Sequence, residues 1–198
     1  MSDVPISIDT RHATVAREAI NAGADIVNDV SGGTFDPLMM KTVASLHVPY
    51  IIMHMRGTPE TMQTLTNYDN VIHDVSEVLV RQSLKAEEVG IPKWLQILDP
   101  GIGFAKDFQQ NLSLLKHCND MRQLVHNYPL LLGPSRKGFI GKITGETNPK
   151  ERDFGTVAAC MLGAIGKRRT STPTILRVHN VRGVKQATMV MDAVLGAR

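Results

Sequence analysis

Short apolar runs alternate with segments of helical periodicity six times along the chain. The runs are rich in leucine or β-branched residues and are apolar on both faces, as in strands covered by helices. We expect six strands, over residues 5–8, 25–30, 50–55, 95–98, 130–132 and 174–178. Because helical segments separate them, these strands predict a parallel sheet of the α/β class.

Five helices can be bounded from apolar stripes of helical spacing. We expect them over residues 13–22, 36–46, 70–89, 149–165 and 182–195, and three of them stop just before a glycine. In the fourth, the positions expected to face inward are Phe154, Val157, Ala158, Met161, Leu162 and Ile165. In the last, they are Val184, Ala187, Met191, Val194 and Leu195.

Two architectures suit such a sheet, an open doubly wound sheet and a TIM-type (β/α)₈ barrel. The first strand is not followed by the glycine pattern G-x-G-x-x-G, which weakens the dinucleotide-binding version of the open sheet. The repeating units average about 32 residues, as in a barrel of about 250 residues. The barrel is favoured, although six strands are two short of its eight.

Composition narrows the class of protein. The chain has 198 residues, 42% hydrophobic and 21% charged, which predicts one folded domain over residues 1–198. A net charge of +3 is too weak to indicate nucleic-acid binding, and the basic run 167–169 is expected to be a solvated loop. No apolar run approaches the roughly 20 residues of a membrane span. Cys118 and Cys160 are expected as free thiols, and without signal-peptide features we expect the cytoplasm, with an organelle such as the mitochondrion as the alternative.

Polar residues stand at the carboxyl end of every expected strand. Ligands of parallel α/β proteins bind at this end of the sheet, and a purely structural sheet does not need such chemistry there. The candidates at or just after the strand ends are Asp9, Asn28, Asp29, His54, Asp99, Ser135, Lys137, Arg177 and His179.

The acidic and amide candidates suit a planar heterocycle. Asp9, Asn28 and Asp99 come from the first, second and fourth strands and offer oxygen acceptors. Such acceptors match a ring edge with several N–H donors, such as a 2-amino-4-oxo pyrimidine. Met53 and Phe104 could floor or sandwich the ring.

The basic candidates suit an anion. Arg177 and His179 lie two residues apart, so they share one face of their strand, and Lys137 follows the neighbouring strand. A lysine, an arginine and a histidine together match phosphate oxygens. The composite ligand is therefore a flat, amino-rich ring that carries a phosphate.

Several of these residues also have a structural interpretation. Asp9 could be only a helix N-cap, and Asp29 more simply braces a loop. Asp99 opens an Asp-Pro-Gly run that could be only a turn, and His54 is more simply a satisfied core histidine. Ser135 has no evident His or Asp relay, and no pair of histidines has metal-binding spacing.

Six motifs carry a resemblance to a known family. They are SIDT (7–10), VNDVSGG (27–33), MHMRGTP (53–59), LDPGIGFAK (98–106), GPSRKGFIG (133–141) and RVHN (177–180). In this order and spacing the chain resembles dihydropteroate synthase, especially the form fused to a pterin pyrophosphokinase in eukaryotes. The resemblance covers nearly the whole chain and begins at the family's third barrel strand, so it implies a (β/α)₈-type barrel that lacks its first two βα units.

The resemblance implies a reaction and its participants. 6-Hydroxymethyl-7,8-dihydropterin pyrophosphate would condense with p-aminobenzoate to 7,8-dihydropteroate and pyrophosphate, in folate biosynthesis. It also implies Mg²⁺ as cofactor, a homodimer, and fusion or pairing with the pyrophosphokinase. The family's metal ligand lies in the part that this chain lacks, so no residue here is expected to bind the metal.

The resemblance also implies roles for single residues. Lys137 would lie over the pterin ring near the incoming aminobenzoate, while Arg177 and His179 would anchor the pyrophosphate. Those implied to read the pterin edge are Asp9, Asn28 and Asp99. Those implied to line the pocket are Met53, Phe104 and Gly133, with Ser135 on the aminobenzoate side. Those implied to be catalytic are Lys137, Asp99, Arg177 and His179.

Two other functions compete with the synthase. Methyltransferases that act on methyltetrahydrofolate share the fold and the acidic pterin readers, but they have no use for a pyrophosphate anchor. A non-catalytic paralogue that binds pterin is the other alternative, because strands one and two and their long loops are absent from the resemblance.

Overall fold

A computed structural model describes residues 4–58, 60–165 and 174–197. The basic run 167–169, expected as a solvated loop, lies outside the described residues. No helix among the described residues is long and apolar enough to cross a membrane.

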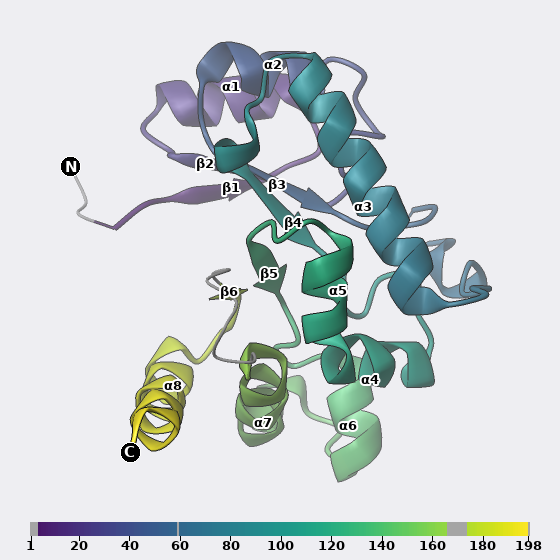
Figure 1. Ribbon diagram of the computed structural model, residues 1–198, viewed down its shortest axis with the longest axis vertical. Helices are drawn as coiled ribbons and strands as arrows, with labels where there is room; N and C mark the ends of the chain where they lie inside the picture. Colours follow the sequence, from purple (N-terminus) through teal and green to yellow (C-terminus); the bar gives the residue numbers. More distant parts are fainter. Residues whose placement is uncertain (1–3, 59, 166–173, 198) are drawn as a thin grey trace.

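Six parallel strands form one sheet in the order β1-β2-β3-β4-β5-β6, which curls into part of a barrel (Figure 1). The fold class is α/β, as predicted. All six strands occur where the apolar runs predicted them, with ends shifted by a few residues. They are β1 (Ser7–Asp9), β2 (Ile26–Asp29), β3 (Tyr50–Met53), β4 (Gln96–Asp99), β5 (Leu130–Leu132) and β6 (Thr174–Leu176).

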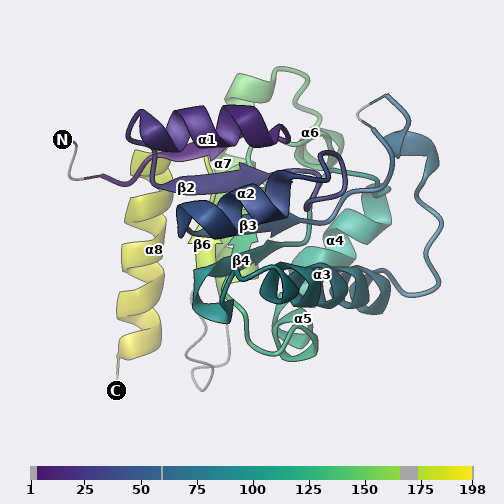
Figure 2. The same ribbon diagram turned by 90° about the horizontal axis from the view of Figure 1, so that it is seen from above.

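Helices follow every strand, and α1 and α2 pack side by side over the first strands (Figure 2). The α-helices are α1 (Ala13–Asn21), α2 (Met39–Leu46), α3 (Val71–Glu88), α4 (Phe108–Lys116), α5 (Cys118–Leu124), α6 (Gly138–Thr144), α7 (Asp153–Ala164) and α8 (Val181–Gly196). The 3₁₀ segments are η1 (Met62–Thr64), η2 (Lys93–Leu95) and η3 (Pro149–Arg152). The apolar pattern predicts no bounds for α4, α5 or α6.

The two faces of the sheet have different roles. Alternate strand residues turn outward into a core shared with the helices, because successive side chains of a strand point to opposite faces. Those outward residues are Val27, Tyr50, Ile52, Leu98, Leu130 and Leu132, all in the main hydrophobic cluster. The residues between them face the barrel interior, so the carboxyl ends of the strands present their polar side chains there.

Helix α7 buries a different face from the predicted one. Phe154 is 91% exposed and Leu162 64% exposed, although both were expected to point inward. A stripe of small residues packs instead, because Gly155 and Gly163 allow close contact: a Cβ on Gly163 would lie 2.7 Å from Leu132. Ala158 and Ile165 are exposed as well, and the buried residues of α7 are Thr156, Ala159, Cys160 and Gly163.

Helix α8 also departs from expectation. Only Val184 is buried among its described residues, while Val194 and Leu195 are exposed. The reason is its position, since α8 stands beside α7 at one end of the fold, away from α1, α2 and α3 (Figure 1). One side of α8 therefore has no helix of the described part packed against it.

Candidate functional site

The register of the sheet gathers the predicted residues at one edge. Asp9 pairs with Asn28 across β1 and β2, and Met53 pairs with Asp99 across β3 and β4. At the other end of the sheet, Arg177 follows β6 and donates its backbone N–H to Leu132. Residues from all six strands therefore meet at the carboxyl end of the barrel interior, where the sequence predicted a ligand.

Asn28 is a half-satisfied buried amide. Its Nδ2 donates to Asp9 Oδ1 at 2.7 Å, while its Oδ1 is buried with no hydrogen-bond partner among the described residues. A buried acceptor without a partner is costly in a folded protein, so such an atom points to a ligand. The N-cap interpretation of Asp9 is wrong, because the first N–H of α1 is bound by Asp36.

Asp99 uses one oxygen for structure and leaves the other available. Its Oδ1 accepts the N–H of Gly101 at 2.7 Å, which braces the turn, and no hydrogen bond joins its Oδ2 to the described residues. Burial raises the pKa of Asp99 to about 6, opposed by the positive charges of Lys106, Lys137 and Arg177. The turn and ligand-binding interpretations of Asp99 are therefore compatible.

Asp29 braces its loop, as the simpler interpretation held. His54 is buried in the core but only half satisfied, because its Nε2 has no hydrogen-bond partner among the described residues. Asp29 accepts hydrogen bonds from the backbone and hydroxyl of Ser31, from Gly33 N–H and from the Tyr50 hydroxyl, which fixes the loop after β2. His54 is 1% exposed, and its Nδ1 lies 3.0 Å from the Nζ of Lys106.

Lys137 occupies the centre of the site. Its Nζ lies 4.0 Å from the centroid of the Phe104 ring, and its stem crosses Gly103, where a Cβ would lie only 2.9 Å away. Burial lowers the pKa of Lys137, opposed by the negative charge of Asp99. The side chain lines three separate cavities, which makes Lys137 the junction between them.

The three cavities differ in size and chemistry. The innermost has about 40 Å³ and holds the acceptors Asn28 and Asp99 together with Met53, Phe104 and Gly133. A second, of about 560 Å³, is lined by basic side chains: Arg136, Lys137, Lys150, Arg177 and His179. A third, of about 280 Å³, is lined by Phe108 and Phe139 and by polar side chains that include Lys106, Asp107, Lys137 and Lys142.

The innermost cavity is closed by the protein's own charges. It offers room for about one water molecule. Arg177 forms an ion pair with Asp9 across the mouth, while Lys137 lies over Phe104. Both cations line this cavity, so a bound ring would exchange some of their protein contacts for ligand contacts.

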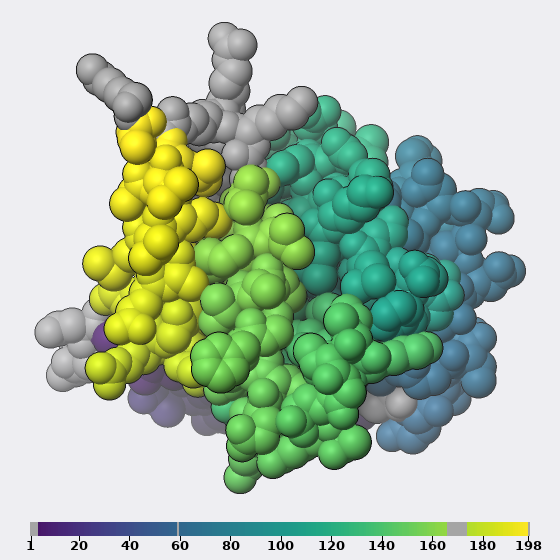
Figure 3. Space-filling view, turned by 90° about the horizontal axis from the view of Figure 1, so that it is seen from below, coloured from purple at the N-terminus to yellow at the C-terminus, as the bar shows by residue number. Residues whose placement is uncertain are grey.

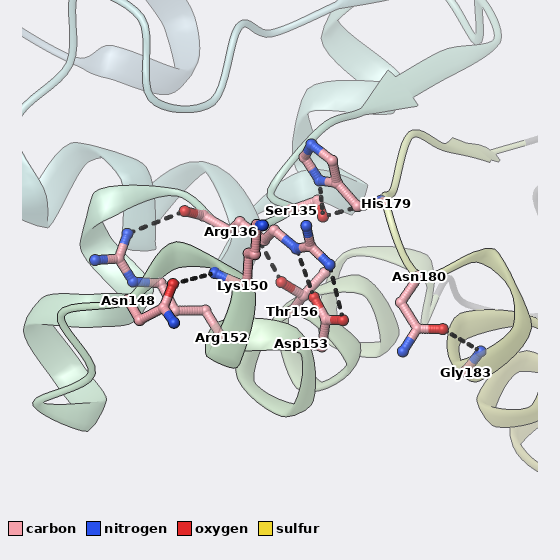
Figure 4. Close-up of polar contacts among 10 residues, drawn as sticks. All are labelled: Ser135, Arg136, Asn148, Lys150, Arg152, Asp153, Thr156, His179, Asn180 and Gly183. Carbon is pink, nitrogen blue, oxygen red and sulfur yellow. Dashed lines mark hydrogen bonds and ion pairs between the residues drawn. The ribbon is translucent and has the colours of Figure 1, made fainter.

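Hydrogen bonds join the segments that line the basic cavity (Figure 4). Ser135 Oγ lies 2.8 Å from His179 Nδ1 and also accepts the backbone N–H of His179. Arg136 binds Asp153 of α7 through two nitrogens, at 2.8 and 3.1 Å, and its N–H donates to Thr156. These bonds hold the loop after β5 against the first turns of α7.

Ser135 lines the basic cavity with His179 and not the cavity of about 280 Å³ next to Lys142. The reason is the sheet order, because β5 and β6 are neighbours and bring the segments after them together. That Ser135 belongs to the aminobenzoate side stays a prediction.

Sequence reasoning missed two pairs that support the site. Lys106 and His54 form one, and Arg136 with Asp153 forms the other. Lys106 and Arg136 both lie within the quoted motifs, but their burial and pairing depend on contacts with distant segments. A lysine two residues after an aromatic in a glycine-rich turn was the available signal.

The described residues do not fit a resident divalent cation. No group of three His, Cys, Asp or Glu side chains there could hold a metal ion. The charged rim next to the acceptors is formed by lysine and arginine, and Asp9 is already paired with Arg177.

Comparisons with known proteins agree with this geometry. Residues 1–179 match the family described as Pterin binding enzyme. The chain is 46% identical over 191 residues to a dihydropteroate synthase of Synechocystis sp., which covers 96% of this chain and 64% of that protein. It is 45% identical over 207 residues to a mitochondrial folate synthesis bifunctional protein of Arabidopsis thaliana, which covers 100% of this chain and 36% of that protein.

A solved structure gives the same likeness. Dihydropteroate synthase from Xanthomonas albilineans, in complex with 7,8-dihydropteroate, matches with a TM-score of 0.87 at 36% identity. That match covers 100% of this chain and 69% of the other. The chain spans less than two thirds of the length of both curated relatives named above.

Proposed function

The chain belongs to the dihydropteroate synthase family of pterin-binding enzymes, and from this premise we propose that its site joins 6-hydroxymethyl-7,8-dihydropterin pyrophosphate to p-aminobenzoate. The products would be 7,8-dihydropteroate and pyrophosphate. The observation that carries the proposal is that two acceptors line one interior cavity: Asn28 Oδ1, which is buried without a hydrogen-bond partner, and Asp99 Oδ2, to which no described residue donates.

The acceptors fit the pterin edge. A dihydropterin ring offers an exocyclic amino group and ring N–H groups, which are donors, and both free acceptors require donors. Met53 and Phe104 line the same cavity and offer the ring a sulfur and an aromatic face. The ring would therefore lie across the middle of the sheet, with its donors toward Asn28 and Asp99.

The basic cavity fits the pyrophosphate. Lys137, Arg177 and His179 converge there, and Arg177 lines both this cavity and the innermost one. A ligand with its ring on Asp99 would thus carry its phosphates toward Arg177. This cationic rim also disfavours the methyltransferase alternative, whose substrate has no pyrophosphate.

The remaining cavity fits p-aminobenzoate. Phe108 and Phe139 offer apolar walls, and Lys142 offers a cation for the carboxylate. Lys137 separates this cavity from the pterin cavity, so the arylamine would reach the pterin methylene beside Lys137.

The reaction then needs no covalent intermediate with the enzyme. The bond between the pterin methylene carbon and the pyrophosphate oxygen breaks, and its electron pair leaves with the pyrophosphate. The arylamine nitrogen donates its lone pair to the methylene carbon and afterwards loses a proton. Asp99 would stabilise positive charge on the ring, while Lys137 and Arg177 would stabilise the departing anion, which is electrostatic catalysis by preorganised groups.

Mg²⁺ stays a prediction of the family resemblance. The described residues do not fit a resident ion, as the site's chemistry indicates, so no step is assigned to the metal. The compartment also stays a prediction, although the Arabidopsis relative is described as mitochondrial.

A homodimer and a fused kinase complete the proposal. Exposed apolar side chains on α6, α7 and α8 include Ile143, Phe154, Leu162 and Met189, and these helices share one face of the molecule (Figure 3). Such a face suits a second copy of this chain. A partner pyrophosphokinase would supply the substrate, and bifunctional relatives support that pairing.

The dimer can be tested by placing a charged side chain on the proposed interface. Phe154→Glu places a carboxylate on an exposed position, so it should convert a dimer to a monomer and leave the fold intact. Light scattering behind a sizing column measures the mass. A wild-type monomer at micromolar concentration contradicts the homodimer.

The function is tested by turnover. The 198-residue chain is supplied with the dihydropterin pyrophosphate, Mg²⁺ and p-aminobenzoate, and dihydropteroate is followed by chromatography, with the Synechocystis enzyme as positive control. Product formation supports the synthase. Pterin binding without product would support the non-catalytic alternative, and absence of both contradicts the proposal.

A further inference from the structure

Lys106 is a buried cation that the proposed reaction does not use. It is 3% exposed, and its Nζ contacts Gly101 O at 3.1 Å, Phe104 O at 2.9 Å and His54 Nδ1 at 3.0 Å. Burying a lysine is costly unless its charge and its N–H groups are satisfied. The three contacts therefore indicate that Lys106 has a specific structural role.

The three contacts match the three donors of an ammonium group. A neutral amine satisfies the same contacts when it donates to the two carbonyls and accepts from a protonated Nδ1 of His54. Burial, with the nearby charges of Lys106 and Arg56, lowers the pKa of His54 to about 3, so the ring is neutral. In either charge state of Lys106, all three contacts of Nζ are hydrogen bonds that hold it in place.

These contacts determine the shape of the loop 100–106. Two of the three acceptors are backbone carbonyls of that loop, so Lys106 closes the loop on itself. Gly101 permits the closure, because its φ is +68° and a Cβ would lie 2.1 Å from His54 O. The loop in turn positions the Phe104 ring below Lys137 and the Gly101 N–H that binds Asp99.

Lys106 also influences the charge of Asp99. The charged groups that face Asp99 are Lys106 from the same loop, Lys137 from the loop after β5 and Arg177 from β6. Those that face Lys106 are Asp99, Arg56 and Lys137, and burial lowers the pKa of Lys106 to about 7, opposed by the charge of Asp99. Of the three cations that face Asp99, Lys106 alone belongs to the loop 100–106, where it is 3% exposed and borders the cavity of about 280 Å³.

We propose that Lys106, paired with His54, is a positioning residue of the pterin site: its amino group closes the loop 100–106, and its charged form favours the ionised carboxylate of Asp99. The inference rests on the proposed function in that it assigns Lys106 to a pterin site. The contacts of Lys106 and the shape of the loop 100–106 do not depend on that function. Lys106 borders the cavity of about 280 Å³, whereas Lys137 lines all three cavities.

The test uses variants of matched size. Lys106→Met removes the charge and keeps the length, and Lys116→Met removes the charge of an exposed lysine on α4 as control. His54→Asn keeps an acceptor near Nδ1, and His54→Leu removes it. Each protein is studied without ligand by ¹³C NMR titration of the Asp99 carboxyl and by hydrogen exchange at the Gly101 and Phe104 amides. Binding of 6-hydroxymethylpterin at pH 7 is then measured by calorimetry.

The expected results distinguish positioning from simple stability. In Lys106→Met the pKa of Asp99 should rise by at least about one unit, because an opposite charge nearby normally lowers it by 1–3 units. Exchange at the two amides should accelerate. Pterin affinity at pH 7 should fall about twofold for a one-unit rise, because the ionised fraction of Asp99 drops from about 0.9 to about 0.5. His54→Leu should show the same changes to a smaller extent. In His54→Asn the Asp99 titration, the amide exchange and the pterin affinity should lie closer to wild type.

Two results would overturn the inference. One is an unchanged Asp99 titration and unchanged loop exchange in folded Lys106→Met, as in Lys116→Met. The second result applies if Lys106→Met does not fold: His54→Leu then matches wild type in both the Asp99 titration and the amide exchange. A wild-type chain that does not bind the pterin would count against the proposed function only, because the titration and exchange do not use ligand.

Discussion

The middle of the sheet and its two edges prepare the site differently. At the middle, Asn28 and Asp99 are buried, and Asp99 is held by a loop that Lys106 closes. At the edges, Asp9 and Arg177 are about half exposed and are joined to each other by an ion pair across the mouth of the barrel. One part is fixed before a ligand arrives, and the other must rearrange to admit it.

This difference matches what each part is proposed to recognise. A heterocycle edge needs acceptors at fixed positions, because hydrogen bonds lose strength steeply with poor geometry. A pyrophosphate is flexible and strongly charged, so exposed cations can follow it. Buried acceptors thus provide specificity, while exposed cations provide attraction for the charged tail.

Removal of Lys137, the junction of the two parts, should have the largest effect. Lys137→Ala is expected to lower turnover by about 100-fold or more, in the range found when one preorganised electrostatic group is lost. Steady-state kinetics measures this, with thermal unfolding as the control for folding. Equal losses of turnover and of stability would contradict a role in the reaction.

Substitution in the buried part should come next. Asp99→Asn keeps the shape but removes the charge, so pterin affinity should fall by about 1–3 kcal/mol, the value of a charge-assisted hydrogen bond in a buried site. The loss should be the same with and without the pyrophosphate group on the ligand. Unchanged affinity in calorimetry would mean that Asp99 only braces its turn.

The pH dependence should follow the buried carboxyl. Burial raises the pKa of Asp99 in the folded chain to about 6 from its ordinary value of 3.8. Pterin affinity should therefore be constant above about pH 6 and fall up to tenfold per unit below it, if binding needs the ionised form. The raised pKa affects folding in the opposite direction, because the folded chain binds this proton more readily than the unfolded chain. The stability therefore rises as the pH falls from 6 toward 3.8. An affinity that is flat from pH 5 to 8 contradicts this account.

Substitution at the exposed edge should be smallest and most selective. Arg177→Met is expected to weaken the pyrophosphate ligand by about 1.5 kcal/mol, near the lower end for a hydrogen bond to a charged group. The hydroxymethyl pterin without phosphates should bind as before or slightly better, because the mouth loses the ion pair that closes it. Equal weakening of both ligands would remove the distinction between edge and middle.

Sequence patterns predicted the sheet and most of the site for one reason. A strand turns alternate residues to opposite faces, so Asn28 and Asp99 had to face the barrel interior once their neighbours Val27 and Leu98 were outward. The carboxyl end of a parallel sheet then brings such residues together without knowledge of side-chain contacts. The bracing role of Asp29 was predicted in the same way, from a loop that begins at a buried strand.

The rest depended on packing that periodicity does not encode. On α7 the bulky residues were expected inside, but Gly155 and Gly163 let the helix approach its neighbours on the opposite face and left Phe154 outside. Lys106 was missed because a lysine is normally exposed. Its acceptor His54 is 52 residues away in the sequence, so no local pattern could pair them.

The most direct test of the account is a calorimetric comparison on the 198-residue chain. Wild type, Asp99→Asn and Arg177→Met are each titrated with 6-hydroxymethyl-7,8-dihydropterin pyrophosphate and with the alcohol that lacks the phosphates. The account predicts that wild type binds both, that Asp99→Asn weakens both equally, and that Arg177→Met weakens only the pyrophosphate. A wild-type chain that binds neither ligand, or an Asp99→Asn variant that binds both unchanged, would contradict a pterin site at the middle of this sheet.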